Sequence, residues 1–179
     1  MAYAAITKPS LHFNTKLYTG NGSDGNAITG VGFQPDFFWT KARSQAYDHM
    51  IIDSSRGVSK NLRSNLTNAS ATDTSNIASF DSDGFTLNQG GYVNGNGVTF
   101  ASWNWKANAG TTSSNTDGSI TSTVQANTTA GFSIVTYTGT GSNATVGHGL
   151  GAVPKVIIIK RRSAVENTSV YHGSTIITS

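Results

Sequence analysis

Short apolar runs, separated by clusters of glycine, asparagine and aspartate, recur along the whole chain. The clearest run lies between Val98 and Trp105. Its alternate residues fall on opposite faces of an extended chain, with Thr99, Ala101, Trp103 and Trp105 on one face and Val98, Phe100, Ser102 and Asn104 on the other. This period of two predicts a β-strand.

Similar patterns predict further strands at residues 13–17, 37–41 and 50–52, and the turn Asp81–Gly84 predicts a hairpin between its flanking phenylalanines. Long segments with helical periodicity are absent. The one ambiguous stretch is Arg56–Leu66, where apolar residues recur every four positions and a helical turn is possible. Many short strands predict an all-β fold, which we expect to be a β-sandwich of the jelly-roll type.

The chain repeats itself without a gap. The sequence YTGNGS at residues 18–23 returns as YTGTGS at residues 137–142, an offset of 119 residues. The same offset pairs Gly30 with Gly149, Gly32 with Gly151, Pro35 with Pro154, Lys41 with Lys160 and Arg43 with Arg162. We therefore expect one β architecture in both copies, with a tight, glycine-dependent turn before the central strand of each.

Four segments follow from this repeat: an N-terminal arm (residues 1–10), a first β module (11–106), a linker (107–119) and a partial second module (120–179). The last residue, Ser179, corresponds to Lys60 of the first copy. A partial module buries its apolar face poorly, so we expect it to belong to a longer repetitive protein or to be completed by neighbouring chains. Its central strand, Val156–Ile159, is apolar throughout and is expected to be buried on both faces.

Composition narrows the function classes. Charged residues make up 12% of the chain and the net charge is +3, which disfavours nucleic-acid binding. The basic cluster Lys160–Arg162 is interpreted as the protected end of a strand. No cysteine is present, so stability must come from packing or from assembly. No stretch has the pattern of a signal peptide or membrane span, so we expect synthesis in the cytoplasm of the producing cell and no membrane partner.

The motifs that could bind a cofactor or a metal are weak. Gly20, Gly22 and Gly25 match a dinucleotide-binding pattern, but no helix can follow them, which favours a turn between strands. Asp81 and Asp83 resemble part of a calcium loop, yet the bidentate glutamate is missing. The four histidines lack metal-ligand spacing, and no nucleophile elbow is found. We therefore expect no catalytic, cofactor-binding or metal-binding residues, and no enzymatic activity.

Trp39, Trp103 and Trp105 are the candidate ligand-stacking residues. Aromatic rings bind sugars by stacking, but the same strand alternation suits a sandwich core, which we favour. Exposed, coplanar rings would support carbohydrate binding, and buried rings would support a scaffold.

The motifs NTKLYTGNGS, ITGVGFQPDFFWTKAR, SSRG, FDSDGFTL and WNWKA resemble a module of structural proteins from marine bacteriophages. The second copy, with GFSIVTYTGTG, TVGHGLGAVPKVIIIKRR and VYHGS, is similar to the unit that follows it in those proteins. The resemblance covers nearly the whole chain. It implies a tail-fibre-like or virion appendage protein and supplies no catalytic residues.

These observations together predict a phage virion structural protein that forms the N-terminal, particle-attachment region of a tail fibre or similar appendage. The expected partners are other virion proteins near the tail or portal, and further copies of the chain, most simply in a trimer. Two alternatives stay open: a carbohydrate-binding module that recognises a host surface glycan, and a capsid decoration protein.

Overall fold

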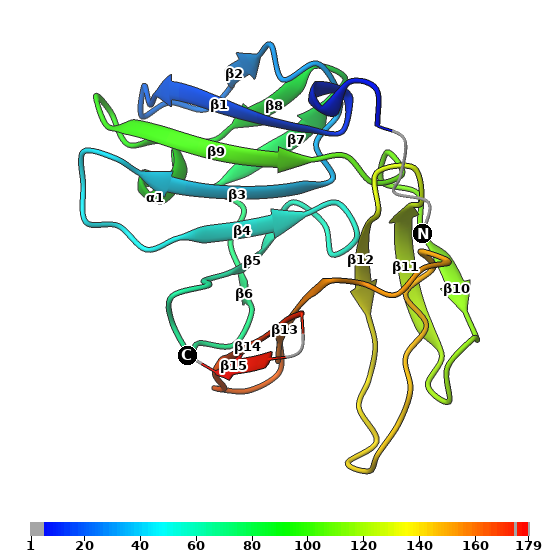
Figure 1. The fold of residues 1–179 in the computed structure, drawn as a ribbon. Coiled ribbons are helices and arrows are strands. Elements are labelled where there is room, and N and C mark those ends of the chain that lie inside the picture. The colour runs from blue at the N-terminus through cyan, green and yellow to red at the C-terminus, as the bar shows by residue number, and fades with distance from the viewer. Residues whose placement is uncertain (1–5, 174, 179) are drawn as a thin grey trace.

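The computed structural model describes residues 6–173 and 175–178, and nearly all of its regular structure is β. The all-β prediction is therefore confirmed. The first copy contains η1 (Pro9–Leu11), β1 (Phe13–Thr19), β2 (Asn26–Thr29), β3 (Phe37–Ala42), β4 (Met50–Asp53), β5 (Lys60–Leu62), β6 (Ala71–Thr72), β7 (Ile77–Asp81), β8 (Gly84–Leu87), the single-turn helix α1 (Gly91–Asn94) and β9 (Thr99–Trp105), as Figure 1 shows.

Two antiparallel sheets form the sandwich of the first copy. The larger has the strand order β1-β9-β3-β4-β5-β6, and the smaller has the order β2-β8-β7. Apolar side chains from both sheets and from α1 meet between them, and the largest fully buried ones include Phe38, Phe85 and Phe100. Since no disulfide is possible, this apolar cluster is the main source of stability for the first copy.

Strand β9 comes last in the first copy but lies near the middle of the large sheet, between β1 and β3. Its Trp105 is opposite Phe13 on one side and Phe37 on the other. Phe100, Ser102 and Asn104 of β9 point toward the smaller sheet and are fully buried. The first copy is thus closed only when its final strand inserts between two earlier ones.

Two segments differ from what the sequence suggested. The helical periodicity in Arg56–Leu66 is overridden by strand pairing, because β5 forms within this segment and pairs with β4. The glycine- and asparagine-rich sequence at residues 92–97 is typical of a turn, but its first three residues belong to the helix α1, whose Val93 is buried in the sandwich core.

The glycine-dependent turn before each central strand is confirmed. Gly30 and Gly32 have φ angles of 80° and 89°, and Gly149 and Gly151 have 70° and 67°. These angles lie in the left-handed region that glycine adopts without steric cost. In the first copy the turn is held by Asp83, whose carboxylate accepts hydrogen bonds from the backbone N–H groups of Gly30 (3.0 Å) and Gly32 (2.7 Å).

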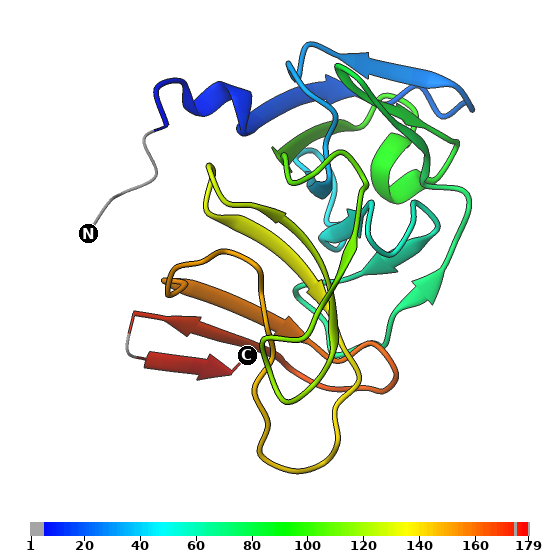
Figure 2. The ribbon, with the colours of Figure 1, turned by 90° about the vertical axis from the view of Figure 1, so that its right-hand side faces the viewer.

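The second part of the chain forms two small antiparallel sheets beside the sandwich (Figures 1 and 2). One comprises β10 (Ser113–Asn115), β11 (Ser122–Asn127) and β12 (Phe132–Thr136), and the other comprises β13 (Val156–Lys160), β14 (Thr168–His172) and β15 (Thr175–Thr178). Strand β10 lies inside the segment expected to be a linker, so residues 107–119 are not wholly irregular.

Both copies use the same central hairpin. In the first copy Phe37 lies opposite Asp53 in the β3–β4 pair, and adding 119 to both numbers gives Val156 and His172, which lie opposite each other in the β13–β14 pair. The agreement extends to the next three residue pairs of each ladder. The prediction that Phe37–Lys41 and Val156–Lys160 adopt the same secondary structure is confirmed.

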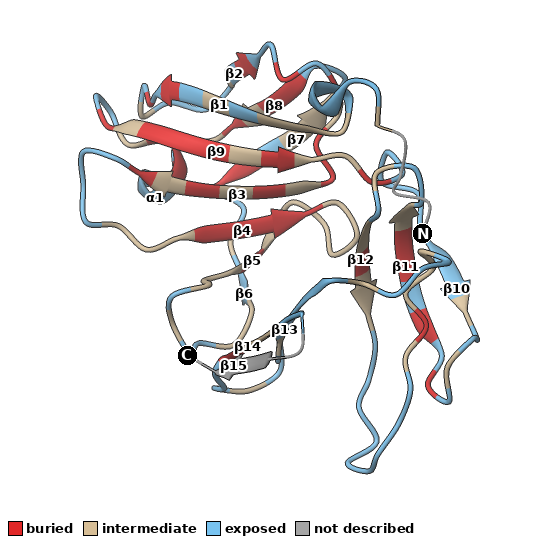
Figure 3. Cartoon of the chain, viewed as in Figure 1, coloured by how far each residue is buried: buried red, intermediate tan, exposed pale blue. Residues whose placement is uncertain are grey.

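The expected burial of Val156–Ile159 is wrong. These four residues keep between 39% and 52% of their surface exposed, and Figure 3 shows β13 as exposed where β4 and β9 are largely buried. The physical reason is that β13 is the outer strand of a three-stranded sheet. The described part of the second copy has no strand that corresponds to β9, so β12 and β13 lie in separate sheets.

Candidate functional site

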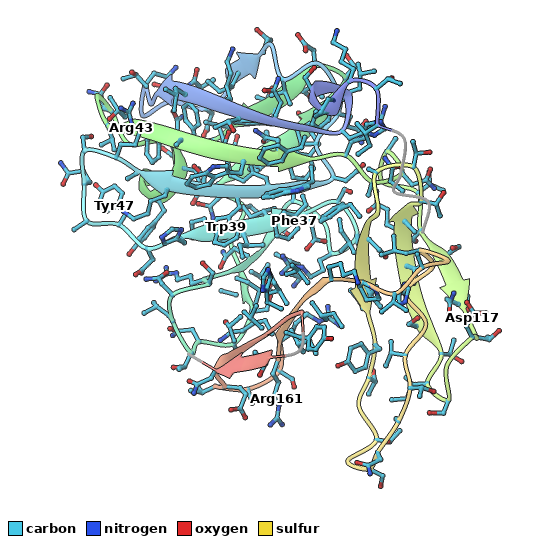
Figure 4. The ribbon with its side chains drawn as sticks, viewed as in Figure 1. Phe37, Trp39, Arg43, Tyr47, Asp117 and Arg161 are labelled. Atoms are coloured by element: carbon cyan, nitrogen blue, oxygen red, sulfur yellow. The ribbon has the colours of Figure 1, made fainter. Side chains whose placement is uncertain are left out.

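The three tryptophans lie on the outer face of the large sheet, which points away from the sandwich core. Trp39 of β3 is directly opposite Trp103 of β9, and Trp105 occupies the next position on the same face. Phe37 and Trp39, labelled in Figure 4, belong to this face as well. All three tryptophans are half-buried and none is part of the core cluster. The favoured interpretation of these residues as sandwich core is therefore wrong.

Trp39 and Trp103 form the centre of the candidate site. Their ring centroids are 6.2 Å apart and their planes are inclined by 65°, so the rings meet edge to face and are not coplanar. Together with His49 and Trp105 they line a hollow of about 280 Å³. This shape offers one exposed aromatic face and one aromatic edge to a ligand, and differs from a flat platform made of two parallel rings.

His49 completes the hollow and is fixed by hydrogen bonds. The indole Nε1–H of Trp39 donates to Nδ1 of His49 at 2.9 Å, which leaves the imidazole proton on Nε2. The backbone N–H of His49 donates to Oδ1 of Asn65 at 3.0 Å. Burial, and then the positive charge of Lys41, lower the pKa of His49. The histidine is therefore neutral at pH 7 and presents a single N–H donor.

Sequence reasoning missed His49 as a member of this site. The signal was available, because Ile51 lies opposite Trp39 in the β3–β4 pair. His49 comes two residues before Ile51, and residues two apart in an extended chain point to the same face. The alternation that places Trp39 on the outer face thus also places His49 there.

Trp105 has a different role from the other two tryptophans. Its ring packs against Phe13 at 4.7 Å and Phe37 at 5.4 Å within the first copy, and it stacks on Phe132 of the second copy at 6.0 Å with an interplanar angle of 20°. A smaller hollow of about 190 Å³ lies beside this cluster, with Ile6 and Pro9 in its wall. Trp105 therefore joins the two copies, and part of its surface is already occupied.

The arm reaches this junction as far as it is described. Ile6 and Pro9 contribute to the smaller hollow, and η1 follows directly. Residues 1–5 of the expected arm lie outside the described residues.

Asp36 fixes the junction from the other side. Its fully buried carboxylate accepts hydrogen bonds from the backbone N–H groups of Ala107 (2.7 Å), Ala109 (3.0 Å) and Gly110 (2.7 Å). The side-chain amide of Gln125 in β11 also donates to it, at 2.7 Å. One carboxylate thus holds the beginning of the segment between the copies and a strand of the second copy.

The remaining motifs serve the fold. The loop with Gly20, Gly22 and Gly25 joins β1 to β2, as expected for a turn. Asp81 accepts hydrogen bonds from the hydroxyl groups of Ser79 and Thr86 (both 2.7 Å), and the N–H groups of Gly32 and Gly30 lower the pKa of Asp83.

Two classes of site are not found in the described part of the chain. It contains no group of three or more histidine, cysteine, aspartate or glutamate side chains placed to hold a metal ion. No helix in it is both long enough and apolar enough to cross a lipid bilayer.

Comparison with known proteins identifies one family. A family described as a domain of unknown function (DUF7483) matches residues 8–179, so the chain belongs to this family. The match includes the whole first copy after the arm and the partial second copy. No curated protein and no solved structure matches the chain.

Proposed function

We propose that this member of the DUF7483 family is a structural protein of a phage virion, in the particle-attachment region of a tail fibre or similar appendage. The observation that carries the proposal is the tandem repeat, whose second copy presents an apolar edge strand, Val156–Ile159, with 39–52% of each residue exposed. Such a surface fits a protein that works inside a larger assembly. The resemblance to phage structural proteins supports the same class of role.

The proposed partners are other virion proteins and further copies of the chain. We place the contact with the particle on the arm and the first copy, and the continuing shaft on the side of the second copy. A cyclic homo-oligomer, most simply a trimer, is the arrangement that a fibre axis favours.

Two measurements test this role. The first is native mass spectrometry of the purified chain, with and without residues 1–10, for which we expect a trimer. A folded monomer at micromolar concentration would contradict the oligomer. The second is antibody labelling of intact phage particles in the electron microscope, for which we expect label at the tail. Label spread over the capsid would instead indicate a decoration protein, and unlabelled particles would contradict any role in the virion.

A second candidate function is carbohydrate binding at the hollow of Trp39, His49 and Trp103. The observation in its favour is that two half-exposed indole rings and one neutral N–H donor converge on about 280 Å³ of open space. A pyranose ring has an apolar face that stacks on an aromatic ring and hydroxyl groups that accept hydrogen bonds. The edge-to-face angle of the rings allows only one of them to stack on the same sugar.

Glycan binding is tested with a glycan array, followed by titration calorimetry on any glycan that binds. Trp103→Ala should weaken that binding about tenfold, because one stacking contact is lost. The matched control is Leu17→Ala. Leu17 is 58% exposed and lies on the same face of the sheet, but outside the hollow. An equal loss of glycan affinity in both variants, or no binding of any glycan, would exclude this function. Neither result would affect the proposed structural role.

A further inference from the structure

The free edge of β13 is the most unusual surface of the second copy. Within the described residues β13 pairs with β14 alone, and the other edge of its backbone faces away from the sheet. Its first four residues, Val156–Ile159, are large, apolar and exposed. Natural edge strands are normally protected by charges, prolines or bulges. Here Pro154 precedes the strand and the amine of Lys160 is held by the carbonyl of Leu66 at 2.8 Å, so Val156–Ile159 is unprotected.

The first copy shows what occupies the corresponding edge. Strand β3 pairs with β4 on one side, and this pair has the same register as β13 with β14. On its other side β3 pairs with β9 over six residues, from Phe37 opposite Trp105 to Ala42 opposite Phe100. The free edge of β13 therefore corresponds to the edge of β3 that β9 covers. Among the described strands of the second copy, none lies on this edge of β13.

The residues of β13 suit such a partner. By the register of the first copy, Val156 and Ile158 correspond to Phe37 and Trp39, which lie opposite the two aromatic residues Trp105 and Trp103. Ile157 and Ile159 correspond to Phe38 and Thr40, which lie opposite Asn104 and Ser102. Cross-strand pairs of aromatic and β-branched side chains stabilise a sheet. The partner strand would also satisfy the backbone groups at the free edge of β13.

We propose that β13 is an acceptor site for one added β-strand. The partner is an extended segment with the alternating pattern of β9, which joins antiparallel to β13 with its Trp105-like residue opposite Val156. This is recognition by strand addition, in which backbone hydrogen bonds supply affinity and alternate side chains supply specificity. The proposal concerns strand pairing alone and does not depend on a role in a virion.

The test uses a fluorescent peptide with the sequence of residues 98–106, flanked by lysines for solubility, and the intact 179-residue chain. We expect saturable binding by fluorescence anisotropy. We also expect the amide hydrogens of residues 156–160 to exchange about tenfold more slowly when the peptide is bound. The control is a peptide of the same composition, scrambled so that the alternation is lost. It should neither bind saturably nor slow the amide exchange of residues 156–160. Equal binding of both peptides, or unchanged exchange at β13, would overturn the proposal.

Two substitutions locate the site on the chain. Ile158→Lys places a charge in the middle of the exposed strand and should abolish peptide binding. Val165→Lys makes the same change at a residue that is 70% exposed and outside any strand, and binding should persist. Circular dichroism checks that both variants stay folded. The peptide comparison on the unaltered chain remains decisive if Ile158→Lys unfolds.

One further outcome would overturn the proposal. The free edge of β13 could pair with the same edge of a second copy of this chain. In that case the amides of residues 156–160 would already be protected without peptide, the native mass would be that of a dimer, and Ile158→Lys would convert it to a monomer.

Discussion

Gly84 occupies a position in the β7–β8 turn that requires the absence of a side chain. Its φ angle is 153°, and a Cβ atom placed there would overlap the backbone carbonyl of Ile28 in the neighbouring strand β2. Gly84 itself is buried and lies opposite Thr29. The close approach of two strands therefore depends on this residue.

The first prediction follows from this contact. Gly84→Ala should lower the free energy of unfolding on the order of 3 kcal/mol, since the small sheet must shift to relieve the overlap. Urea denaturation measures the change. Gly91→Ala is the control, because a Cβ atom there meets nothing within 4 Å and its φ angle is not positive. If both variants lost the same stability, the overlap with Ile28 would not be the cause.

The second prediction concerns His49 and pH. The pKa of His49 is lowered in the folded chain, chiefly by burial, from its ordinary value of 6.5. The unfolded chain thus binds the proton more readily. The stability that neutral His49 contributes is present above pH 6.5 and is lost as pH falls from 6.5 toward the lower pKa of the folded state. Protonation also removes the acceptor for the indole N–H of Trp39.

Unfolding free energies measured at several pH values test this prediction. The stability of the unaltered chain should fall more steeply below about pH 6.5 than that of His49→Gln, which has no imidazole to titrate. The other three histidines are the same in both proteins. Parallel curves over the whole range would show that His49 does not couple folding to pH.

Alternation along the chain predicted several individual positions correctly, but it did not reveal which face of β9 is buried. One face of β9 carries the tryptophans, and the opposite face carries the polar residues Ser102 and Asn104. The polar face is inside, because it also carries Phe100 and lies beside Phe38 of β3. Some of its polar atoms form hydrogen bonds. The amide of Asn104 donates to the carbonyl of Asn14 at 3.1 Å and to the hydroxyl of Ser102 at the same distance. Side-chain polarity was therefore a poor guide at this strand.

At the scale of elements, the sequence predicted a strand correctly where the signal lies in neighbouring residues. Strands β1, β3, β4 and β9 and the β7–β8 hairpin follow from alternation and turn residues, and the repeat correctly placed β13. The burial of β13 could not be predicted from neighbouring residues. An apolar strand is buried only if other elements cover it, and the strand that covers its counterpart in the first copy comes from the far end of the module.

The contacts of Asp36 also escaped sequence reasoning. They join residues more than 70 positions apart, and no local pattern indicates them.

The third prediction concerns this carboxylate. Asp36→Asn replaces one acceptor oxygen with an NH₂ group that would face N–H donors. We expect a loss of about 2–3 kcal/mol in the free energy of unfolding, and faster amide exchange at Ala107, Ala109 and Gly110. Asp117→Asn is the matched control, because Asp117 is exposed and its carboxylate accepts a hydrogen bond from one side-chain amide, that of Asn115, at 2.8 Å (Figure 4). Unchanged exchange at the three amides would contradict the role given to Asp36.

At the scale of the whole molecule, two separate sets of contacts hold the second copy against the first. On one side β11 and β12 reach the first copy through Gln125 and Phe132. On the other side the β13–β14 connection follows the segment 64–70, with the N–H of Ser70 bonded to the carbonyl of Arg162 at 2.9 Å and the N–H of Glu166 bonded to the carbonyl of Thr67 at 2.9 Å. The second set combines these backbone bonds with one from the amine of Lys160 to the carbonyl of Leu66 at 2.8 Å, so its strength depends less on side-chain identity. The first set depends on a few side chains, so a single substitution can weaken it.

The last prediction uses this difference. Phe132→Ala removes the ring that stacks on Trp105 and lies 5.9 Å from Phe37, so the β11–β12 side of the junction should loosen while the backbone contacts persist. Trp105 should then become more accessible, and we expect stronger quenching of tryptophan fluorescence by acrylamide and faster amide exchange in β11 and β12. Tyr137→Ala is the control, because it removes an aromatic ring from the same copy that is already 39% exposed. If Phe132→Ala and Tyr137→Ala gave the same quenching, the aromatic stack would not be what joins the two copies. Unchanged exchange in β11 and β12 would point instead to Asp36 and Gln125 as the dominant contacts between them.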